Sequence, residues 1–246
     1  MSKVLILIPS RMSAKRLPNK PLLKIDNLSI ISHVVKRGKE TGLGDVIVCT
    51  EDNEILVEVE KNGGKAILTG NHHKNGTERI YEGLQKLKLK DNKFIILLQG
   101  DEPAINPNDI KNLYRCMINN NCDIGTLASE IKDHSMFNNQ NVVKVETDKK
   151  LTKNNFPIAL NFFRDNLSKN NSNIYHHIGI YCYKNSILEK FIGLEETNNE
   201  KINRLEQLRA IDNKININVA LADNSPIGID SEEDYLALKK IMEYKS

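Results

Sequence analysis

The chain has 246 residues, and its 35 Lys and Arg residues against 32 Asp and Glu residues leave a formal net charge of +3. This excess is too small and too evenly spread to indicate a nucleic-acid-binding surface. Hydrophobic residues make up 39% and charged residues 27%, which is typical of a globular chain and excludes a disordered, fibrous or membrane-embedded one. The length fits one large domain, or one domain with a sizeable insertion.

The first half of the chain alternates between continuous apolar runs and segments with helical periodicity. The apolar runs predict strands, and they lie at 4–8, 46–49, 66–68 and 94–98. The periodic segments predict helices: one that ends near Gly42, one capped by Asp52, one capped by Thr77 and one opened by Asn106 and Pro107. Strands that are apolar on both faces and separated by helices predict a mainly parallel sheet with helices on both faces, an α/β fold.

The pattern changes after the helix that follows Pro107. Strands are predicted at 142–145 and 178–183, with a stretch rich in Asn and Lys and little periodicity between them, at 148–173. The end is regular again, with a helix at 201–211, a strand at 215–221 and a last helix that Ser231 caps. We therefore expect one domain over 1–246 with an inserted lobe at roughly 129–212.

The opening segment predicts neither export nor membrane insertion. Its apolar run before Pro9 is too short for a signal sequence or a bilayer span, so a cytoplasmic protein without membrane contact is expected. The four cysteines form no CxxC pair and have no histidine at zinc-finger spacing, so we expect them to be reduced and mostly buried: Cys49, Cys116, Cys122 and Cys182.

In an open parallel sheet, ligands bind beyond the carboxyl ends of the strands, so the loops after the predicted strands are the informative ones. The loop at 9–21 follows the first strand and carries four fixed cations among its residues. A looped path of this length can wrap a triphosphate with guanidinium forks and a lysine charge. It lacks both the P-loop and the dinucleotide-binding glycine patterns, and a plain solvated basic loop is the alternative.

A second loop, 99–103, delivers Asp101 to the tip of a central strand. Mg²⁺ takes one or two protein carboxylates together with phosphate oxygens, and Asp101 is placed for that role. Asp230, just before the last helix, could be a second metal carboxylate. The alternatives are a turn-forming aspartate at 101 and a capping residue at 230.

Two further features have plain alternatives. Asn75 to Arg79 combine a glycine, a threonine and a helix N-terminus, which suits polar contacts to a nucleotide but is also adequate as an ordinary helix cap. The tandem pairs His72-His73 and His176-His177 are expected to point to opposite faces of a strand, so neither pair is expected to chelate one ion.

Six blocks, taken together and in order, resemble the 3-deoxy-manno-octulosonate (KDO) cytidylyltransferases, also called CMP-KDO synthetases. The blocks are 11–21, 76–79, 99–103, 177–181, 205–209 and 228–230. They are distributed over nearly the whole length of the chain. The resemblance implies a Rossmann-like nucleotide-diphospho-sugar transferase fold with an inserted dimerisation lobe, and hence a homodimer. It also implies transfer from CTP to KDO, giving CMP-KDO and pyrophosphate for lipopolysaccharide synthesis, with Mg²⁺ required.

The same resemblance implies roles for individual residues. The residues expected to act directly in catalysis are Arg11, Lys20, Asp101 and Asp230. Nucleotide binding is assigned to Arg11, Ser13, Arg16, Lys20, Thr77 and Arg79. The two aspartates would ligate Mg²⁺. The sugar acid would contact Gln99, Lys153, His177, Glu206 and Gln207.

Lys153 and Lys184 stand where the family commonly has arginine, so recognition of the substrate carboxylate is the open point. An 8-amino-KDO, another 2-keto-3-deoxy acid or a sialic-type acid stays possible as substrate. A non-catalytic CTP-binding regulator is the alternative from another class. Intact Asp101 and Asp230 argue against it, because CTP binding alone does not need carboxylates placed to activate a hydroxyl.

Overall fold

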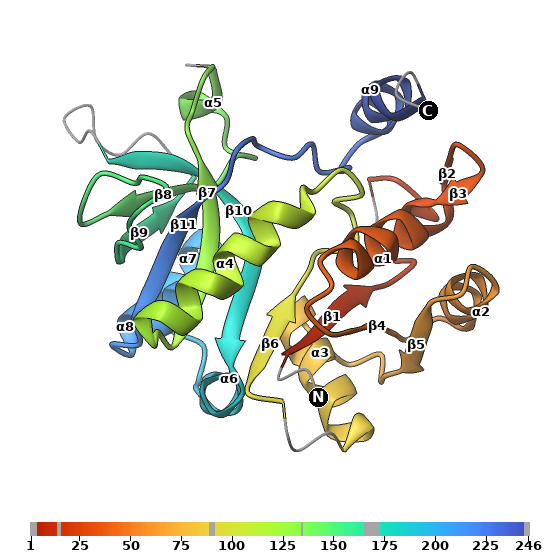
Figure 1. Ribbon diagram of the computed structural model, residues 1–246, viewed down its shortest axis with the longest axis horizontal. Coiled ribbons are helices and arrows are strands. Elements are labelled where there is room, and N and C mark those ends of the chain that lie inside the picture. Colours follow the sequence, from red (N-terminus) through yellow and green to blue (C-terminus); the bar gives the residue numbers. More distant parts are fainter. Residues whose placement is uncertain (1–3, 14–15, 89–91, 134, 165–172, 244–246) are drawn as a thin grey trace. The chain divides into compact units, whose positions relative to one another are not determined.

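The computed structural model describes residues 4–13, 16–88, 92–133, 135–164 and 173–243. The chain divides into two compact units, which we describe separately: unit 1 comprises 1–108 and 226–246, and unit 2 comprises 109–225 (Figure 1). The expected single domain with a lobe at roughly 129–212 stays a prediction.

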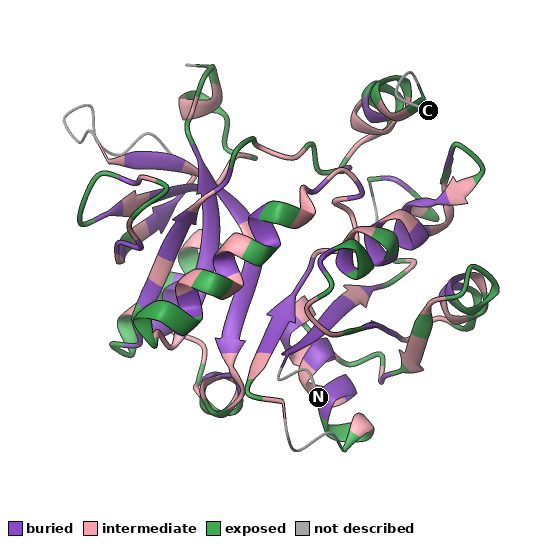
Figure 2. Ribbon diagram, viewed as in Figure 1, coloured by how far each residue is buried: buried purple, intermediate pink, exposed green. Residues whose placement is uncertain are grey.

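Unit 1 is built on a parallel sheet. Its strands are β1 (Val4–Ser10), β4 (Asp45–Thr50), β5 (Lys65–Leu68) and β6 (Phe94–Leu97), in the order β6-β1-β4-β5, and each neighbouring pair is parallel. The strands predicted for this region are confirmed. The apolar run of β1 is at most 2% exposed from Val4 to Ile8, as expected for a strand covered on both faces (Figure 2).

Helices cover both faces of this sheet. They are α1 (Ile30–Glu40), α2 (Asn53–Lys61) and α3 (Gly76–Leu87). Gly38 of α1 lies so close to Val46 that an added Cβ would be 3.0 Å from its side chain, and Gly83 of α3 would place a Cβ 2.4 Å from the sulfur of Cys49. Side chains three residues apart on β4 point to opposite faces, so α1 and α3 pack on opposite sides.

The caps of two helices differ from the prediction. The side chain of Asn75, and not that of Thr77, caps α3 by accepting a hydrogen bond from the backbone N–H of Glu78 at 2.8 Å. Asn75 stands three residues before Glu78, the spacing that lets a side-chain oxygen reach the third helical N–H, whereas Thr77 lies within the first turn and is buried. Asp52 precedes α2 as predicted, but its carboxylate makes no capping bond to that helix.

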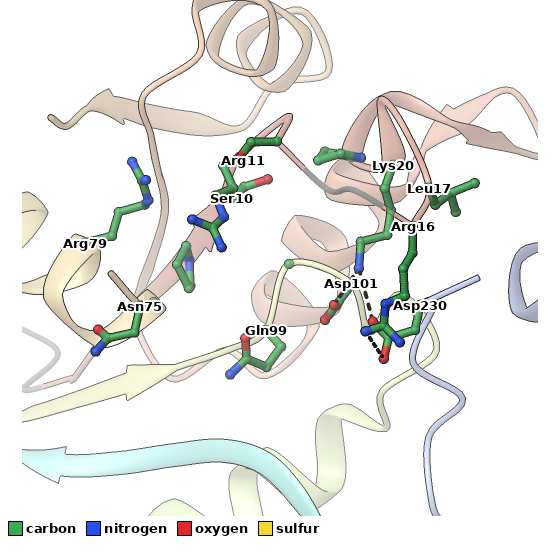
Figure 3. A pocket seen from close by; sticks show the side chains of 15 residues that line it. Ser10, Arg11, Arg16, Leu17, Lys20, Asn75, Arg79, Gln99, Asp101 and Asp230 are labelled. Atoms are coloured by element: carbon green, nitrogen blue, oxygen red, sulfur yellow. Dashed lines mark hydrogen bonds and ion pairs between the residues drawn. The ribbon is translucent and has the colours of Figure 1, made fainter. Parts of the chain in front are cut away.

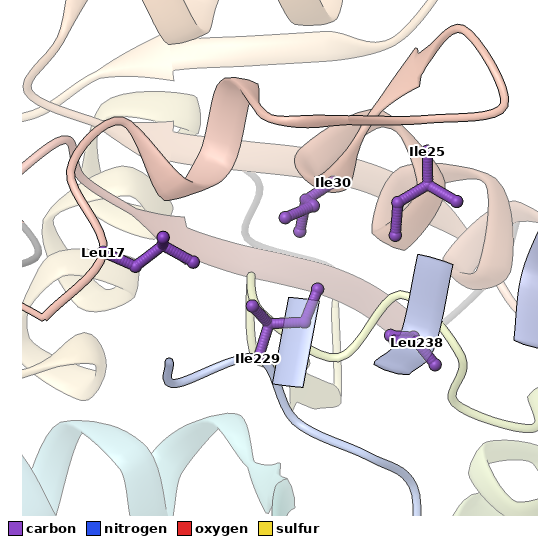
Figure 4. Close-up of a cluster of buried hydrophobic side chains, with 5 residues drawn as sticks. All are labelled: Leu17, Ile25, Ile30, Ile229 and Leu238. Carbon is purple, nitrogen blue, oxygen red and sulfur yellow. The ribbon is translucent and has the colours of Figure 1, made fainter. Parts of the chain in front are cut away.

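Several short segments of unit 1 meet in one hydrophobic cluster (Figure 4). One residue each comes from β2 (Lys24–Ile25), α1 and α9 (Glu232–Glu243), and two come from loops. Two further short elements precede α1 in the chain, η1 (Lys20–Leu22) and β3 (Leu28–Ser29). The cluster itself consists of Leu17, Ile25, Ile30, Ile229 and Leu238. Ser231 caps α9 as predicted, since its hydroxyl accepts from the N–H of Asp234 at 3.2 Å.

Unit 2 contains a mixed sheet. Its strands are β7 (Ile124–Ser129), β8 (Lys144–Thr147), β9 (Ala159–Phe163), β10 (Ile174–Lys184) and β11 (Ile217–Leu221). β11 and β7 are parallel, whereas the pairs β7-β10, β10-β8 and β8-β9 are antiparallel. Strand β9 falls within the stretch 148–173 that was expected to lack periodicity. Of that stretch, residues 165–172 lie outside the described residues.

The helices of unit 2 are short, apart from α4 (Pro107–Asn120), whose start belongs to unit 1. The others are α5 (Ser135–Asn138), α6 (Asn185–Ile192), α7 (Asn198–Asn203) and α8 (Leu208–Asp212). The single helix predicted at 201–211 is wrong. Arg204 adopts a left-handed backbone conformation with φ of 52°, which ends α7 before α8 begins.

Two further predictions concern the cysteines and membrane-spanning segments. All four cysteines lie in described segments and are free; Cys49 and Cys182 are buried, and Cys116 and Cys122 are half-buried. Among the described residues, no helix has both the length and the apolar character that crossing a bilayer would require.

Candidate active site

A cavity of about 450 Å³ opens at the carboxyl ends of the strands of unit 1 (Figure 3). This volume lies in the range of small-molecule sites. The loop after β1, the start of α3, the loop after β6 and the segment before α9 supply its walls, and all of them belong to unit 1. The lining residues are Pro9, Ser10, Arg11, Ser13, Arg16, Leu17, Lys20, Pro21, Asn75, Gly76, Arg79, Gln99, Gly100, Asp101 and Asp230.

Two cations and two carboxylates converge at one end of this cavity. The Nζ of Lys20 donates to Oδ2 of Asp101 at 2.8 Å and lies 3.7 Å from Oδ1 of Asp230. A guanidinium nitrogen of Arg16 lies 3.2 Å from Oδ2 of Asp230. The structure thus brings the two predicted metal carboxylates to one point, although 129 positions separate them in the sequence (230 minus 101).

Packing beside Asp230 explains this convergence. Ile229 is fully buried in the hydrophobic cluster of unit 1, together with Leu17 from the basic loop. The N–H of Ile229 donates to the backbone carbonyl of Asp101 at 3.0 Å, and its own carbonyl accepts from Lys20 at 2.7 Å. Burial of one isoleucine therefore fixes the backbone that presents Asp230 to the cavity.

Glu102 adds a third carboxyl group that the sequence analysis missed. Its Oε2 is buried and has no hydrogen-bond partner among the described residues. Burial, together with the nearby charges of Asp101 and Asp230, raises the pKa of Glu102 to about 8, so this carboxyl is mostly protonated at neutral pH. Its place directly after Asp101 was the available signal, but sequence spacing could not distinguish a buried carboxyl from an exposed one.

The basic loop is attached to the segment between β4 and α2 by a hydrogen bond between residues 40 positions apart. The backbone N–H of Met12 donates to Oδ2 of Asp52 at 2.8 Å, so this carboxylate binds the basic loop and makes no capping bond to α2. The loop residues Arg11 and Ser13 are exposed on either side of this attachment and line the cavity. Residues 14 and 15 of this loop lie outside the described residues.

Arg79 lines the cavity but is bound by the protein itself. Its side chain is 3% exposed and donates to Thr69 Oγ1 at 2.8 Å, to the Gly70 carbonyl at 3.1 Å and to Glu51 Oε2 at 2.5 Å. Gln99 also lines the cavity. Thr77 is buried and is not among the lining residues. Of these three residues, Arg79 and Gln99 line the cavity, and Arg79 is held in place by three hydrogen-bond partners from its own unit.

The remaining predicted site residues belong to unit 2 and differ in exposure. His177 is 8% exposed, and its Nε2 is 3.0 Å from Thr126 Oγ1. Lys153 is exposed and pairs with Asp223 at 2.6 Å. Gln207 is 9% exposed, and Glu206 precedes it in the turn before α8.

Lys184, the other departure from the family pattern, has a local role within unit 2. Its Nζ donates to the Asn121 carbonyl at 2.8 Å and to Asp123 Oδ1 at 3.0 Å. The side chain therefore joins the end of β10 to the turn before β7.

Comparison with known proteins identifies the family of this chain. The family model described as "Cytidylyltransferase" matches residues 5–217. A 3-deoxy-manno-octulosonate cytidylyltransferase from Thermodesulfovibrio yellowstonii is 42% identical, with 96% of each chain covered. The enzyme of the same name from Bartonella bacilliformis is 38% identical, with 98% of each covered.

Solved structures give the same answer. A CMP:2-keto-3-deoxy-manno-octonic acid synthetase complexed with CTP superposes with a TM-score of 0.91, at 32% identity and with both chains covered completely. A UDP-glucose pyrophosphorylase complexed with UDP-glucose superposes with a TM-score of 0.71 at 15% identity, covering 98% of this chain and 99% of the other, a likeness of fold alone. The predicted α/β nucleotidyltransferase fold is confirmed, and the chain belongs to the 3-deoxy-manno-octulosonate cytidylyltransferase family of nucleotidyltransferases.

Proposed function

We propose that this protein transfers the cytidylyl group of CTP to 3-deoxy-D-manno-oct-2-ulosonate, giving CMP-KDO and pyrophosphate. The observation that carries the proposal is the meeting of the basic loop with Asp101 and Asp230 in one cavity of unit 1. The family membership and the neighbour complexed with CTP support it. Use of the product in lipopolysaccharide synthesis follows from the family resemblance.

The triphosphate is the first ligand to account for. Arg11, Ser13 and Arg16 belong to one loop whose side chains reach the cavity, and Lys20 follows at its end. Guanidinium groups bind phosphate oxygens in pairs, whereas an ammonium group acts as a point charge. We assign these four residues to the phosphates. Arg79, fixed by Glu51 and Thr69, and the buried Thr77 are assigned to shaping the nucleotide end of the cavity.

The chemistry of the donor set fits Mg²⁺ at the other end. Asp101 and Asp230 both offer hard carboxylate oxygens, the donor type that Mg²⁺ prefers, and both lie within 4 Å of the same Lys20 Nζ. When bound, such a cation neutralises phosphate charge and lowers the pKa of the attacking hydroxyl. The ammonium group of Lys20 forms ion pairs with both aspartates and so holds the two carboxylates near one another.

In the reaction, the anomeric hydroxyl of the sugar attacks the α-phosphorus in line and pyrophosphate leaves. The protein has little covalent work to do, so positioning and charge neutralisation supply most of the lowering of the barrier. Arg11, Arg16 and Lys20 stabilise the charge that accumulates on the leaving pyrophosphate. We assign no general base to a protein side chain.

For the sugar acid we keep Gln99, Lys153, His177, Glu206 and Gln207 as proposed contacts. The pair between Lys153 and Asp223 leaves a lysine charge at the surface of unit 2, where the family commonly has a guanidinium fork. On the family membership we propose KDO as the substrate. Because of the lysine at position 153, 8-amino-KDO or a sialic-type acid are the alternatives. The homodimer and the cytoplasmic location are proposed on the family resemblance, and light scattering of the purified protein tests the dimer.

A pyrophosphate-release assay with CTP, Mg²⁺ and a panel of 2-keto sugar acids tests the function. The expected result is turnover with KDO above that with 8-amino-KDO and with a sialic acid. Preferred turnover of another acid would replace the substrate but keep the reaction. CTP binding without turnover of any acid would contradict the enzyme and favour the regulator.

A further inference from the structure

The segment after β5 brings two adjacent histidines together, contrary to the expectation from sequence. His72 and His73 lie in irregular backbone and not on a strand, so the alternation of side chains along a strand does not apply to them. Their ring centroids are 4.3 Å apart. The Nε2 of His73 also contacts Oε2 of Glu82, which projects from α3.

These three side chains form a compact set of metal-binding donors. One nitrogen of each imidazole and one carboxylate oxygen of Glu82 all lie within 4.8 Å of one another. Ligands around a tetrahedral zinc ion stand about 3.3 Å apart, given bonds of about 2.0–2.1 Å. Small side-chain rotations therefore suffice to place all three donors on one ion. Two imidazoles and a carboxylate are the ligands of a borderline transition metal, and Mg²⁺ prefers oxygen alone.

The surroundings of Glu82 keep its carboxylate oriented and ionised. The backbone N–H of Gly70 donates to both of its oxygens, at 2.9 and 3.1 Å, and Lys86 lies 2.7 Å from Oε1. Burial acts to raise the pKa of Glu82, but the hydrogen bonds from Lys86, Gly70 and His73 outweigh it and lower that pKa to about 2. Hydrogen bonds that hold a ligating carboxylate in this way are typical of metal sites.

The absence of a side chain at Gly70 makes room for His72. An added Cβ there would lie 2.6 Å from the His72 ring and 3.3 Å from Oε2 of Glu82. His73 is 7% exposed at its side chain and His72 is exposed, so the cluster has a buried floor and an open side that water or a further ligand can occupy. This is the arrangement of a site with three protein ligands and one open position.

We propose that His72, His73 and Glu82 form a zinc-binding site, separate from the carboxylate site at Asp101 and Asp230. The two sites share no residue and differ in ligand chemistry, so the proposal does not rest on the proposed reaction. A bound ion would tie the segment at 70–73 to α3, whose N-cap Asn75 and first residue Gly76 line the cavity.

Calorimetric titration of the metal-free, full-length protein with zinc sulfate tests the site, in the presence of millimolar Mg²⁺. The expected result is one equivalent of zinc per chain with micromolar or tighter affinity. His72→Ala removes an exposed ligand that the fold does not need, so we expect at least a tenfold weaker affinity with an unchanged circular dichroism spectrum. Gly70→Ala, which displaces the same ring, is expected to weaken binding in the same direction.

Two matched controls make the test decisive. His33→Ala removes a half-buried imidazole on α1 that hydrogen-bonds the Ile25 carbonyl, and it is expected to leave zinc affinity unchanged. Lys65→Gln removes an exposed lysine that pairs with Asp45, outside the cluster, and is expected to leave zinc affinity unchanged. Zinc affinity that is the same in wild type and His72→Ala, or absent from the wild type, would overturn the proposal, as would an equal loss in His33→Ala.

Discussion

An ion pair in the cavity of unit 1 and an ion pair inside unit 2 differ in how far their side chains are exposed to solvent. In the cavity, Arg16 and Asp230 form an ion pair whose side chains are 62% and 53% exposed. In unit 2, Arg209 and Glu200 form a two-point ion pair whose side chains are 3% and 10% exposed, and Arg209 also lies over the Phe191 ring at 5.2 Å.

We interpret this difference as separating the proposed ligand-binding groups from groups that stabilise the fold. An exposed ion pair contributes little to stability, so breaking the pair between Arg16 and Asp230 to bind the proposed phosphate and cation costs little. A buried pair cannot be broken without leaving an uncompensated charge in a low-dielectric interior. The block at 205–209, one of the six that carry the family resemblance, therefore contains a structural arginine.

The largest effect is expected for Arg209→Ala, which leaves the buried Glu200 carboxylate without its ion-pair partner. We expect the free energy of unfolding to fall by about 3–5 kcal/mol, measured by urea denaturation. Lys65→Ala, which breaks the exposed pair with Asp45, is the control and is expected to change stability little. A loss in Arg209→Ala no larger than that of the control would remove the contrast between the two regions.

Asp101→Asn tests the cavity side of the comparison. Because charge develops at the phosphates in the transition state, we expect turnover to fall about 10²–10³-fold with a much smaller loss of CTP affinity. Pyrophosphate release measures the first quantity and calorimetry the second. Asp45→Asn, on the surface of unit 1, is the matched control. An unchanged rate at saturating Mg²⁺ would refute the assignment of Asp101 as a metal ligand.

We expect His177 to make the stability of unit 2 sensitive to acid. Burial, with a smaller contribution from the neighbouring His176, lowers the pKa of His177 to about 3, against an ordinary value of 6.5. The unfolded chain therefore binds more protons between these values, and the stability from neutral His177 is full above pH 6.5 and is lost as the pH falls toward 3. The expected loss at pH 5 is about 2 kcal/mol, from about 1.4 kcal/mol per pH unit.

His177→Gln sharpens this prediction, because glutamine can hydrogen-bond Thr126 without titrating. Urea denaturation between pH 7 and pH 5 should give a smaller drop in the free energy of unfolding for the variant than for the wild type. Equal drops would show that His177 is not the source of the acid sensitivity.

The smallest effect is expected for Arg11→Ala, which removes one proposed phosphate contact from the lining of the cavity. A single charge-assisted hydrogen bond corresponds to about a tenfold fall in kcat/KM for CTP, with stability unchanged. Arg115→Ala, an exposed arginine on α4, is the control for general charge. If both variants behave alike at low and at high salt, the role of Arg11 is nonspecific.

The sequence alone determined the local elements whose residues carry their own signal. Continuous apolar runs identified β1, β4 and β6, because a strand covered on both faces must be apolar throughout. The cations after β1 and the carboxylate after β6 followed from their positions at strand ends. The helix cap was misplaced by two residues, since Asn75 and Thr77 are both good capping residues and only the backbone path decides between them.

Only the tertiary structure decided which distant residues meet. Asp230 reaches Lys20 and Asp101 because Ile229 is buried beside Leu17, and no periodicity encodes that contact over 200 positions. The convergence of His72 and His73 on Glu82 depends on irregular backbone, for which sequence provides no repeating pattern. The physical reason is common to both: local signals determine strands and helices, whereas long-range packing determines loops, and most residues of this protein's candidate sites lie on loops.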